Sequence, residues 1–196
     1  IELVFNADNA GGARQVLWEE GGNTNALNIY IEGGQIYFNI RDAGDFGPFT
    51  ITAPIVSGQT YHAAVVFDSV GSGTFTGYLD GVAVGSGVVT SNFDAHTGNI
   101  GIGSLQDQSY MHDGPSPANT FRFNGRISDV ALYNTALSPG EIDYHARSLN
   151  IESEIEYRHA QFEKILTEID ALVRDASFRG QALLAGDEIL TVPNET

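Results

Sequence analysis

The chain has 196 residues and no cysteine, and its 25 acidic residues against 9 basic ones give a formal net charge of −16. A sequence without cysteine excludes disulfides and thiolate chemistry. Its acidity leaves no basic surface for DNA or RNA, so we expect no nucleic-acid partner. No apolar run approaches the roughly 20 residues of a membrane-spanning helix, so we expect no membrane insertion either.

The first residues, IELVFNADN, already follow a strand-like pattern, and no initiator methionine precedes them. We therefore expect the chain to be a fragment or processed product of a longer protein, so that targeting segments are missing from view.

Short apolar segments separated by Gly, Asn and Asp predict strands from residue 1 to about 135. The segment IYIEGGQIYFNI predicts a hairpin, since Gly33 and Gly34 supply the positive φ that a two-residue turn needs. GYLDGVAVG predicts a second hairpin, with Asp80 and Gly81 at its turn. Together with the 23 glycines, these signals favour an antiparallel sandwich or jelly roll. Trp18, the single tryptophan, is predicted in the core or at a sheet edge.

A helix start follows the strands. Ser138 is the predicted N-cap, Pro139 the first helical residue and Glu141 the partner in a capping box. Beyond residue 151 the apolar positions recur at alternating spacings of three and four, which is a heptad pattern. Such a helix must cover this seam with the sandwich, a second copy or an absent part of the parent chain. The seam consists of Ile155, His159, Phe162, Leu166, Ile169, Val173 and Ala176, widened by Ile165 and Leu172.

Four segments along the middle of the chain are informative together, in the order in which they occur: YHAAVVFD (61–68), GYLDGVAVGSG (77–87), IGIGS (100–104) and FNGRISDVALYNTALSPGEI (123–142). In this order they resemble laminin G-like, concanavalin A-like jelly-roll domains of bacterial surface proteins, over about residues 1–147. The resemblance implies a mainly β fold, an antiparallel jelly-roll sandwich with a C-terminal helical arm. We accordingly divide the chain into a jelly roll (1–148) and an arm (149–196). Tyr61, Ala63, Val65 and Phe67 are expected to face the core, which Ile127, Val130 and Leu132 close.

The tail resembles a different family. QFEKILTEIDALVRDASFRGQALLAGDEILTVPNE (161–195) is similar to the N-terminal segment of bacterial flagellin, in which a long helix leads into Leu-Leu-x-Gly-Asp-x-Leu-x-Val. The order differs from flagellin, because a jelly roll precedes the helix and no flagellin C-terminal helix occurs within these 196 residues. What the resemblance implies is helix packing and self-association through residues 151–177, and no catalysis.

Catalytic patterns are weak. Jelly-roll glycosidases need Glu-x-Asp-x-x-Glu on one strand, so that two carboxylates lie roughly 5–5.5 Å apart. Glu-Ile-Asp occurs at 141–143 and at 168–170, but both copies lie on predicted helix and neither is followed by the second Glu at that spacing. Ser-His-Asp and His-Glu-x-x-His patterns are missing from the sequence. We predict that the protein is not an enzyme.

Calcium is the better chemical candidate, because hard cations prefer carboxylate and carbonyl oxygens. The loop at 103–120 offers Asp107, Asp113 and Asn119 among Gly and Pro. The alternative is a solvated loop in which Asp113 simply makes a turn. Asp42 and Asp45 form a second acidic loop, for which solvation is the simpler interpretation, and a zinc site between His96 and His112 is a minor possibility.

Tyr110, His112 and Phe46 are the predicted ligand contacts, since all three fall in predicted loops beside acidic residues. Our leading hypothesis is a non-catalytic extracellular recognition or adhesion module of a bacterial surface or secreted protein. It would bind glycan or an extracellular protein through its rim loops, with calcium. The second hypothesis is a structural subunit or decoration of a filament-like assembly, joined through the flagellin-like helix. A jelly-roll glycosidase is a distant third.

Overall fold

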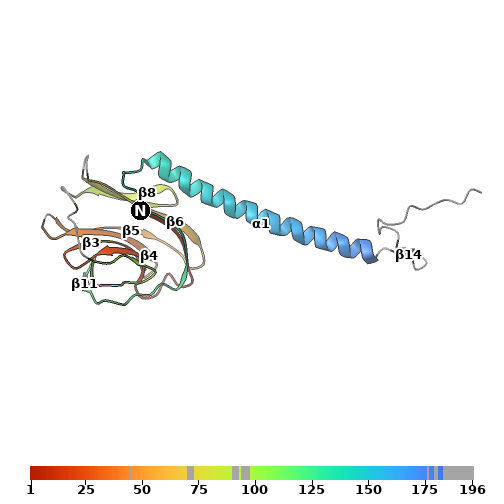
Figure 1. Ribbon diagram of the computed structural model, residues 1–196, viewed down its shortest axis with the longest axis horizontal. Coiled ribbons are helices and arrows are strands. Elements are labelled where there is room, and N and C mark those ends of the chain that lie inside the picture. Colours follow the sequence, from red (N-terminus) through yellow and green to blue (C-terminus); the bar gives the residue numbers. More distant parts are fainter. Residues whose placement is uncertain are drawn as a thin grey trace, which may run out of the picture. The chain divides into compact units, whose positions relative to one another are not determined.

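The computed structural model describes residues 1–44, 46–69, 73–89, 93, 98–175, 177–178 and 181–182. Two five-stranded antiparallel sheets face each other in it (Figure 1). Sheet A has the order β12 (Gly125–Ala131), β1 (Glu2–Ala7), β6 (Thr60–Asp68), β7 (Thr74–Leu79), β8 (Val82–Val88). Sheet B has the order β5 (Phe46–Pro54), β4 (Gln35–Asp42), β3 (Asn25–Glu32), β2 (Gln15–Gly21), β9 (Gly101–Ile102). The remaining elements are the hairpin β10 (Ser109–Met111) and β11 (Gly114–Ser116), the helix α1 (Pro139–Asp175), and the pair β13 (Ser177–Phe178) and β14 (Gln181–Ala182).

Both predicted hairpin turns are present. Gly33 and Gly34, at φ values of 57° and 80°, connect β3 to β4. Asp80 and Gly81, at 50° and 82°, connect β7 to β8. Two successive residues with positive φ give the turn a twist that matches the right-handed twist of the strands. The predicted fold class, an antiparallel sandwich with a C-terminal helix, is confirmed.

The core lies between the two sheets. Along β6, Tyr61, Ala63 and Val65 are buried in it, as the alternation of the sequence predicts. Trp18 is also in this core, where it is 1% exposed. Leu132 is a correction, because it lies beyond β12 and is 54% exposed instead of closing the core.

The first turns of α1 pack on the outer face of sheet A. Ser138 caps the helix: its hydroxyl accepts a hydrogen bond from the Glu141 backbone N–H, and the Glu141 carboxylate accepts one from the Ser138 backbone N–H at 2.7 Å. Ile142 is buried against Ala64 and Tyr78 of the sheet. The predicted capping box is therefore confirmed, and it fixes where the helix begins.

The chain divides into two compact units, Ile1–Arg147 and Ser148–Thr196, and α1 runs from the first into the second. No described helix is long and apolar enough to cross a membrane. In the second unit the described apolar side chains of the predicted seam are exposed to solvent: Phe162, Ile165, Leu166, Ile169 and Leu172. The flagellin-like segment beyond residue 182 lies outside the described residues, and the resemblance remains a prediction.

Candidate functional site: the outer face of sheet B

Two rows of side chains cross the outer face of sheet B, because strand register places residues of neighbouring strands opposite one another. Register pairs Glu19 with Asn28, Asn28 with Asn39, and Asn39 with Thr50, which makes a polar row across four strands. The alternate residues Ile29, Phe38 and Ile51 point into the core. A second, aromatic row lies two residues along β3, β4 and β5, and three along β2, where the register shifts between Val16 and Trp18. This row contains Val16, Tyr30, Tyr37 and Thr52.

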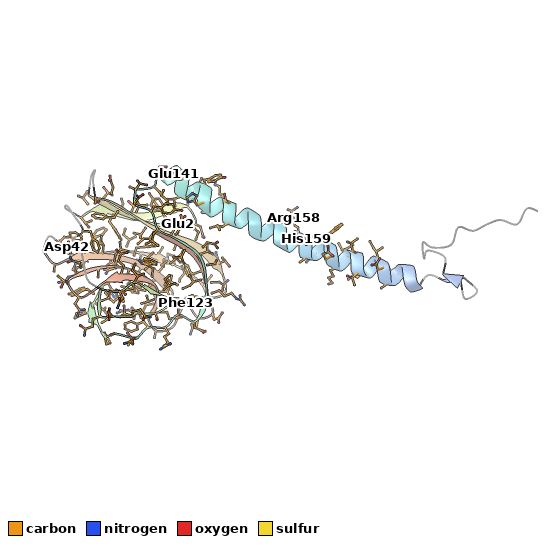
Figure 2. All side chains as sticks on the ribbon, viewed as in Figure 1. Glu2, Asp42, Phe123, Glu141, Arg158 and His159 are labelled. Carbon is orange, nitrogen blue, oxygen red and sulfur yellow. The ribbon has the colours of Figure 1, made fainter. Side chains whose placement is uncertain are left out.

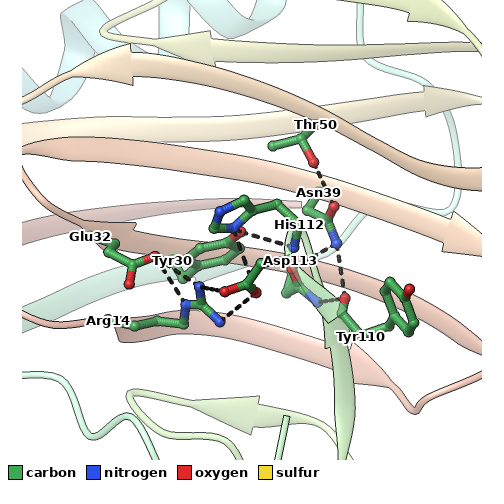
Figure 3. Close-up of polar contacts among 9 residues, drawn as sticks. Arg14, Tyr30, Glu32, Asn39, Thr50, Tyr110, His112 and Asp113 are labelled. Carbon is green, nitrogen blue, oxygen red and sulfur yellow. Dashed lines mark hydrogen bonds and ion pairs between the residues drawn. The ribbon is translucent and has the colours of Figure 1, made fainter. Parts of the chain in front are cut away.

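The β10–β11 hairpin covers part of this face (Figure 3). The Tyr110 carbonyl accepts hydrogen bonds from Asn28 Nδ2 at 3.1 Å and from Asn39 Nδ2 at 3.0 Å. Asn39 Oδ1 in turn accepts the Thr50 hydroxyl at 2.7 Å. Because both asparagines are fully buried, these bonds satisfy amides that would otherwise destabilise the sheet. The polar row thus binds the β10–β11 hairpin to sheet B.

The aromatic row carries a stack of three rings. Tyr30 and Tyr37 lie 4.8 Å apart between centroids and are nearly parallel, and His112 stacks on Tyr37 at 4.8 Å. Burial raises the pKa of Tyr30, so its hydroxyl keeps its proton at neutral pH. The His112 backbone N–H donates to this hydroxyl at 3.3 Å, and His112 Nδ1 lies 2.6 Å from the same oxygen, so two hydrogen bonds join His112 to Tyr30.

Arg14 joins the hairpin to the sheet from the side of the stack (Figure 3). Its side chain is only 7% exposed and lies over the rings of Tyr30 and Phe121, at 5.2 and 5.3 Å. It donates to Glu32 at 2.8 Å and, through two nitrogens, to Asp113 at 3.0 and 2.9 Å. These hydrogen bonds lower the pKa of Asp113. A bidentate, partly buried pair of this kind orients the hairpin more firmly than a surface ion pair does.

The structure brings two of the three predicted ligand contacts to this face. His112 is exposed, and the ring of Tyr110 is half-buried beneath Arg41, whose guanidinium carbon lies 3.8 Å from the ring centroid. Phe46 was predicted to lie in a loop, but it is the first residue of β5, and its half-buried ring packs against the core. The sheet ladder extends to Phe46 because its backbone pairs with Asp42.

The three predicted calcium ligands have separate partners. Asp113 is bound by Arg14, whereas Asp107 Oδ2 accepts a hydrogen bond from Asn99 Nδ2 at 2.6 Å. Asn119 has a positive φ of 57°, and its backbone N–H donates to Gln106. Within the described part of the chain, no three His, Cys, Asp or Glu side chains are placed to share a metal ion. Calcium therefore remains a prediction, and Asp45 and His96 lie outside the described residues.

The two Glu-Ile-Asp segments lie on α1, as predicted. Glu141 belongs to the capping box, and Asp143 pairs with Arg147 one turn later at 2.8 Å. Glu168 and Asp170 are exposed on the helix surface. Both pairs therefore lie on a helix, whereas a jelly-roll glycosidase carries its two carboxylates on a strand.

A cavity of about 520 Å³ opens elsewhere in the first unit. None of the predicted ligand or metal residues lines it, and no ring stack or ion-pair cluster described above borders it. The outer face of sheet B has the denser arrangement of aromatic, amide and charged groups, so we take that face as the candidate site. The cavity is lined by Leu27, Phe93, Ile142 and the segments 65–69 and 132–137, among others.

Three residues of this site, Arg14, Tyr30 and Tyr37, were not predicted from the sequence. Arg14 and Asp113 are 99 positions apart, so no local pattern connects them. The tyrosines carried a usable signal: in IYIEGGQIYFNI they alternate with Ile29 and Phe38, which places them on the opposite face of the sheet. That signal identifies a face but not the segment that covers it.

Comparison with known proteins agrees with this architecture. The model of the concanavalin A-like lectin/glucanases superfamily matches residues 1–143. No curated protein matches the sequence.

Solved structures show the same fold at low identity. The CBM40 of the Ruminococcus gnavus IT-sialidase, bound to α2,3-sialyllactose, gives a TM-score of 0.54 at 17% identity, over 74% of this chain and 80% of that one. An SAP-like pentraxin from Limulus polyphemus gives 0.54 at 17%, over 74% and 67%. A NanB sialidase mutant from Streptococcus pneumoniae gives 0.55 at 21%, over 72% of this chain and 23% of that one.

Proposed function

Since the chain belongs to the concanavalin A-like lectin/glucanases superfamily, we propose that it is a non-catalytic module that binds glycan on the outer face of sheet B. The observation that carries this proposal is the stack of Tyr30, Tyr37 and His112 beside the exposed Thr52. Aromatic faces pack on the apolar faces of sugar rings, and an exposed hydroxyl beside them can bind the sugar hydroxyls.

Within the site, the residues divide by exposure. Tyr37, Thr52 and His112 are exposed or half-buried and would contact the sugar. Tyr30 and Arg14 are buried and would position the ring stack and the hairpin. The likeness to a CBM40 bound to sialyllactose supports a glycan as the ligand class. The extracellular location and the adhesive role expected from the sequence belong to the same proposal.

The proposal is tested by titrating the full chain with a panel of glycans, including sialyllactose, by calorimetry. Tyr37→Ala and His112→Ala should each weaken binding at least tenfold, because each removes one stacking surface. Tyr144→Ala is the matched control, since Tyr144 is 69% exposed on α1, two residues after Ile142, which packs on sheet A. An unchanged glycan affinity in both site variants would refute the proposal that glycan binds on this face. Hydrolysis of a panel member would refute a non-catalytic role.

A second function is favoured by one observation, the exposed seam of α1. Phe162 is 57% exposed and Leu172 is 70% exposed, and such a stripe on a helix favours a partner helix. We propose self-association between copies of the chain through this helix. The glycan-binding face lies in the first unit and the exposed seam in the second, so the two proposals rest on different residues.

A further inference from the structure

The charges beside the ring stack are distributed unevenly between buried and exposed groups. Arg14 carries a positive charge on a side chain that is 7% exposed. Glu32 and Asp113 carry negative charges, and their side chains are 34% and 56% exposed. Together the three groups have one net negative charge, and the part of them that meets solvent is mainly acidic. This distribution affects which glycans the face can bind.

Arg14 has little capacity left for an anionic ligand. Its Nε and Nη2 donate to Glu32 at 3.2 and 2.8 Å, and its Nη1 and Nη2 donate to Asp113 at 3.0 and 2.9 Å. These bonds engage most of the N–H donors that a guanidinium offers. Burial would lower the pKa of Arg14, but its hydrogen bonds with Asp113 and Glu32 raise it instead, so both carboxylates stabilise the charged form. A sugar carboxylate would have to displace one of them.

Arg41, a second arginine on this face, is also engaged. Its guanidinium carbon lies 3.8 Å from the centroid of the Tyr110 ring, and its Nη1 donates to the backbone carbonyls of Asn23 and Thr24. Along β4 it is four residues from Tyr37, which separates the two backbones by roughly 13 Å. A single sugar ring packed on Tyr37 would therefore lie away from Arg41.

The exposed acids lie next to the rings of the stack. Glu32 is two residues along β3 from Tyr30, on the same face of the sheet, and Asp113 Oδ1 lies 3.9 Å from His112 Nδ1. Not every acid of sheet B is exposed in this way, since Asp42, at the end of β4 (Figure 2), is 1% exposed. A ligand on the ring stack would thus meet the carboxylates of Glu32 and Asp113.

We propose that this face binds uncharged glycans and rejects acidic ones, with Glu32 and Asp113 as the groups that determine the specificity. This inference rests on the proposed glycan-binding function. Selection against a ligand often depends on repulsive charges, and a carboxylate placed about 4 Å from one of these acids should lose roughly fivefold or more in affinity. A neutral sugar avoids this repulsion, because ring faces and hydroxyls recognise it without a charge.

The test compares matched neutral and acidic oligosaccharides by calorimetry of the full chain at pH 8, where imidazoles are uncharged. The pairs are lactose and α2,3-sialyllactose, mannotriose and trimannuronic acid, and galactotriose and trigalacturonic acid. In about 20 mM NaCl, at least one neutral member should bind, roughly fivefold or more tightly than its acidic partner. In about 300 mM NaCl this ratio should narrow, because salt screens exposed charges, while the neutral affinity stays constant.

The variant Glu32→Gln tests the origin of the selectivity. It should lower the ratio of neutral to acidic affinity by roughly threefold or more, because it removes one repelling charge and releases donors of Arg14. Asp143→Asn is the matched control, since it changes the net charge equally and also removes an acid that pairs with an arginine, but on α1. Its ratio should equal that of the wild type. Asp113→Asn takes the place of Glu32→Gln if that variant does not fold.

The possible results distinguish this inference from the proposed function. If no member of any pair binds, the proposed function fails, and the inference fails with it. If an acidic member binds as tightly as its neutral partner, or more tightly, glycan binding stands and the inference is overturned. Equal ratios in Glu32→Gln and Asp143→Asn would also overturn it, because the discrimination would then come from the charge of the whole chain.

Discussion

At the scale of single residues, Arg14 connects more of the candidate site than any predicted residue does. It bonds Glu32 on the sheet and Asp113 on the hairpin, and its guanidinium lies over Tyr30. A buried guanidinium is stable only when paired, so the acids that pair with it become structural. This explains why Asp113, predicted as a calcium ligand, has a different partner.

The Arg14–Asp113 pair predicts how stability changes with pH. Arg14 holds the folded pKa of Asp113 below its ordinary value of 3.8, so the pair stabilises the fold above that pH and is lost as the pH falls through the lower folded value. Because Asp113 is 56% exposed, we expect an effect of about 1 kcal/mol or less. Thermal melts between pH 6 and pH 2.5 should show a smaller loss of Tm on acidification for Asp113→Asn than for the wild type. An equal loss of Tm on acidification in the wild type and in Asp113→Asn would contradict a stabilising Arg14–Asp113 pair.

At the scale of elements, the two sheets fit because glycines on sheet A face large side chains on sheet B. A Cβ at Gly77 of β7 would lie 2.7 Å from the ring of Phe38, and one at Gly87 of β8 would lie 2.3 Å from Phe49. Such distances require the rings or the strands to move, and close-packed interiors resist this. Some of the glycines that suggested turns therefore have a packing role inside strands.

Gly77→Ala should accordingly destabilise the sandwich by about 1–3 kcal/mol through overpacking against Phe38. The loss is measured by urea denaturation of the full chain. Gly47→Ala is the matched control in a strand of sheet B, where an added Cβ meets nothing within 4 Å. The double variant Gly77→Ala/Phe38→Leu should recover part of the loss, since the smaller side chain vacates the contact. Equal stability of the two alanine variants would show that the sheets adjust freely.

At the scale of the whole molecule, the two units have different surfaces. The first buries its apolar side chains between two sheets, whereas the described part of the second exposes a stripe of five. An exposed stripe of this size on a helix favours association, because burying apolar surface is the main driving force between helices in water.

Sedimentation velocity over a hundredfold concentration range tests the association. The full chain should form larger species as concentration rises, and a chain lacking residues 151–196 should remain a monomer. Phe162→Glu with Ile169→Glu should have the same effect while keeping the helix, since both side chains are about half exposed. A full chain that stays monomeric throughout would contradict the proposal for this chain.

Much of the first unit was predictable from local patterns. Alternation in YHAAVVFD placed Tyr61, Ala63 and Val65 in the core, and dipeptides of turn chemistry placed both hairpins. These signals are reliable because a strand or turn is decided by neighbouring residues. The prediction that Leu132 closes the core was wrong, because it used only the apolarity of this residue. Leu132 lies beyond the end of β12 and is exposed.

By itself, the sequence determined the fold class, the turns, the helix cap and the exclusion of cysteine chemistry, because each depends on residues close together in the chain or on composition. Only the tertiary structure decided which side chains share a site. The pairing of Arg14 with Asp113 and the stacking of His112 on Tyr37 both depend on one hairpin folding over sheet B. Contacts across 75 to 100 positions follow from strand order and register, which no local pattern specifies.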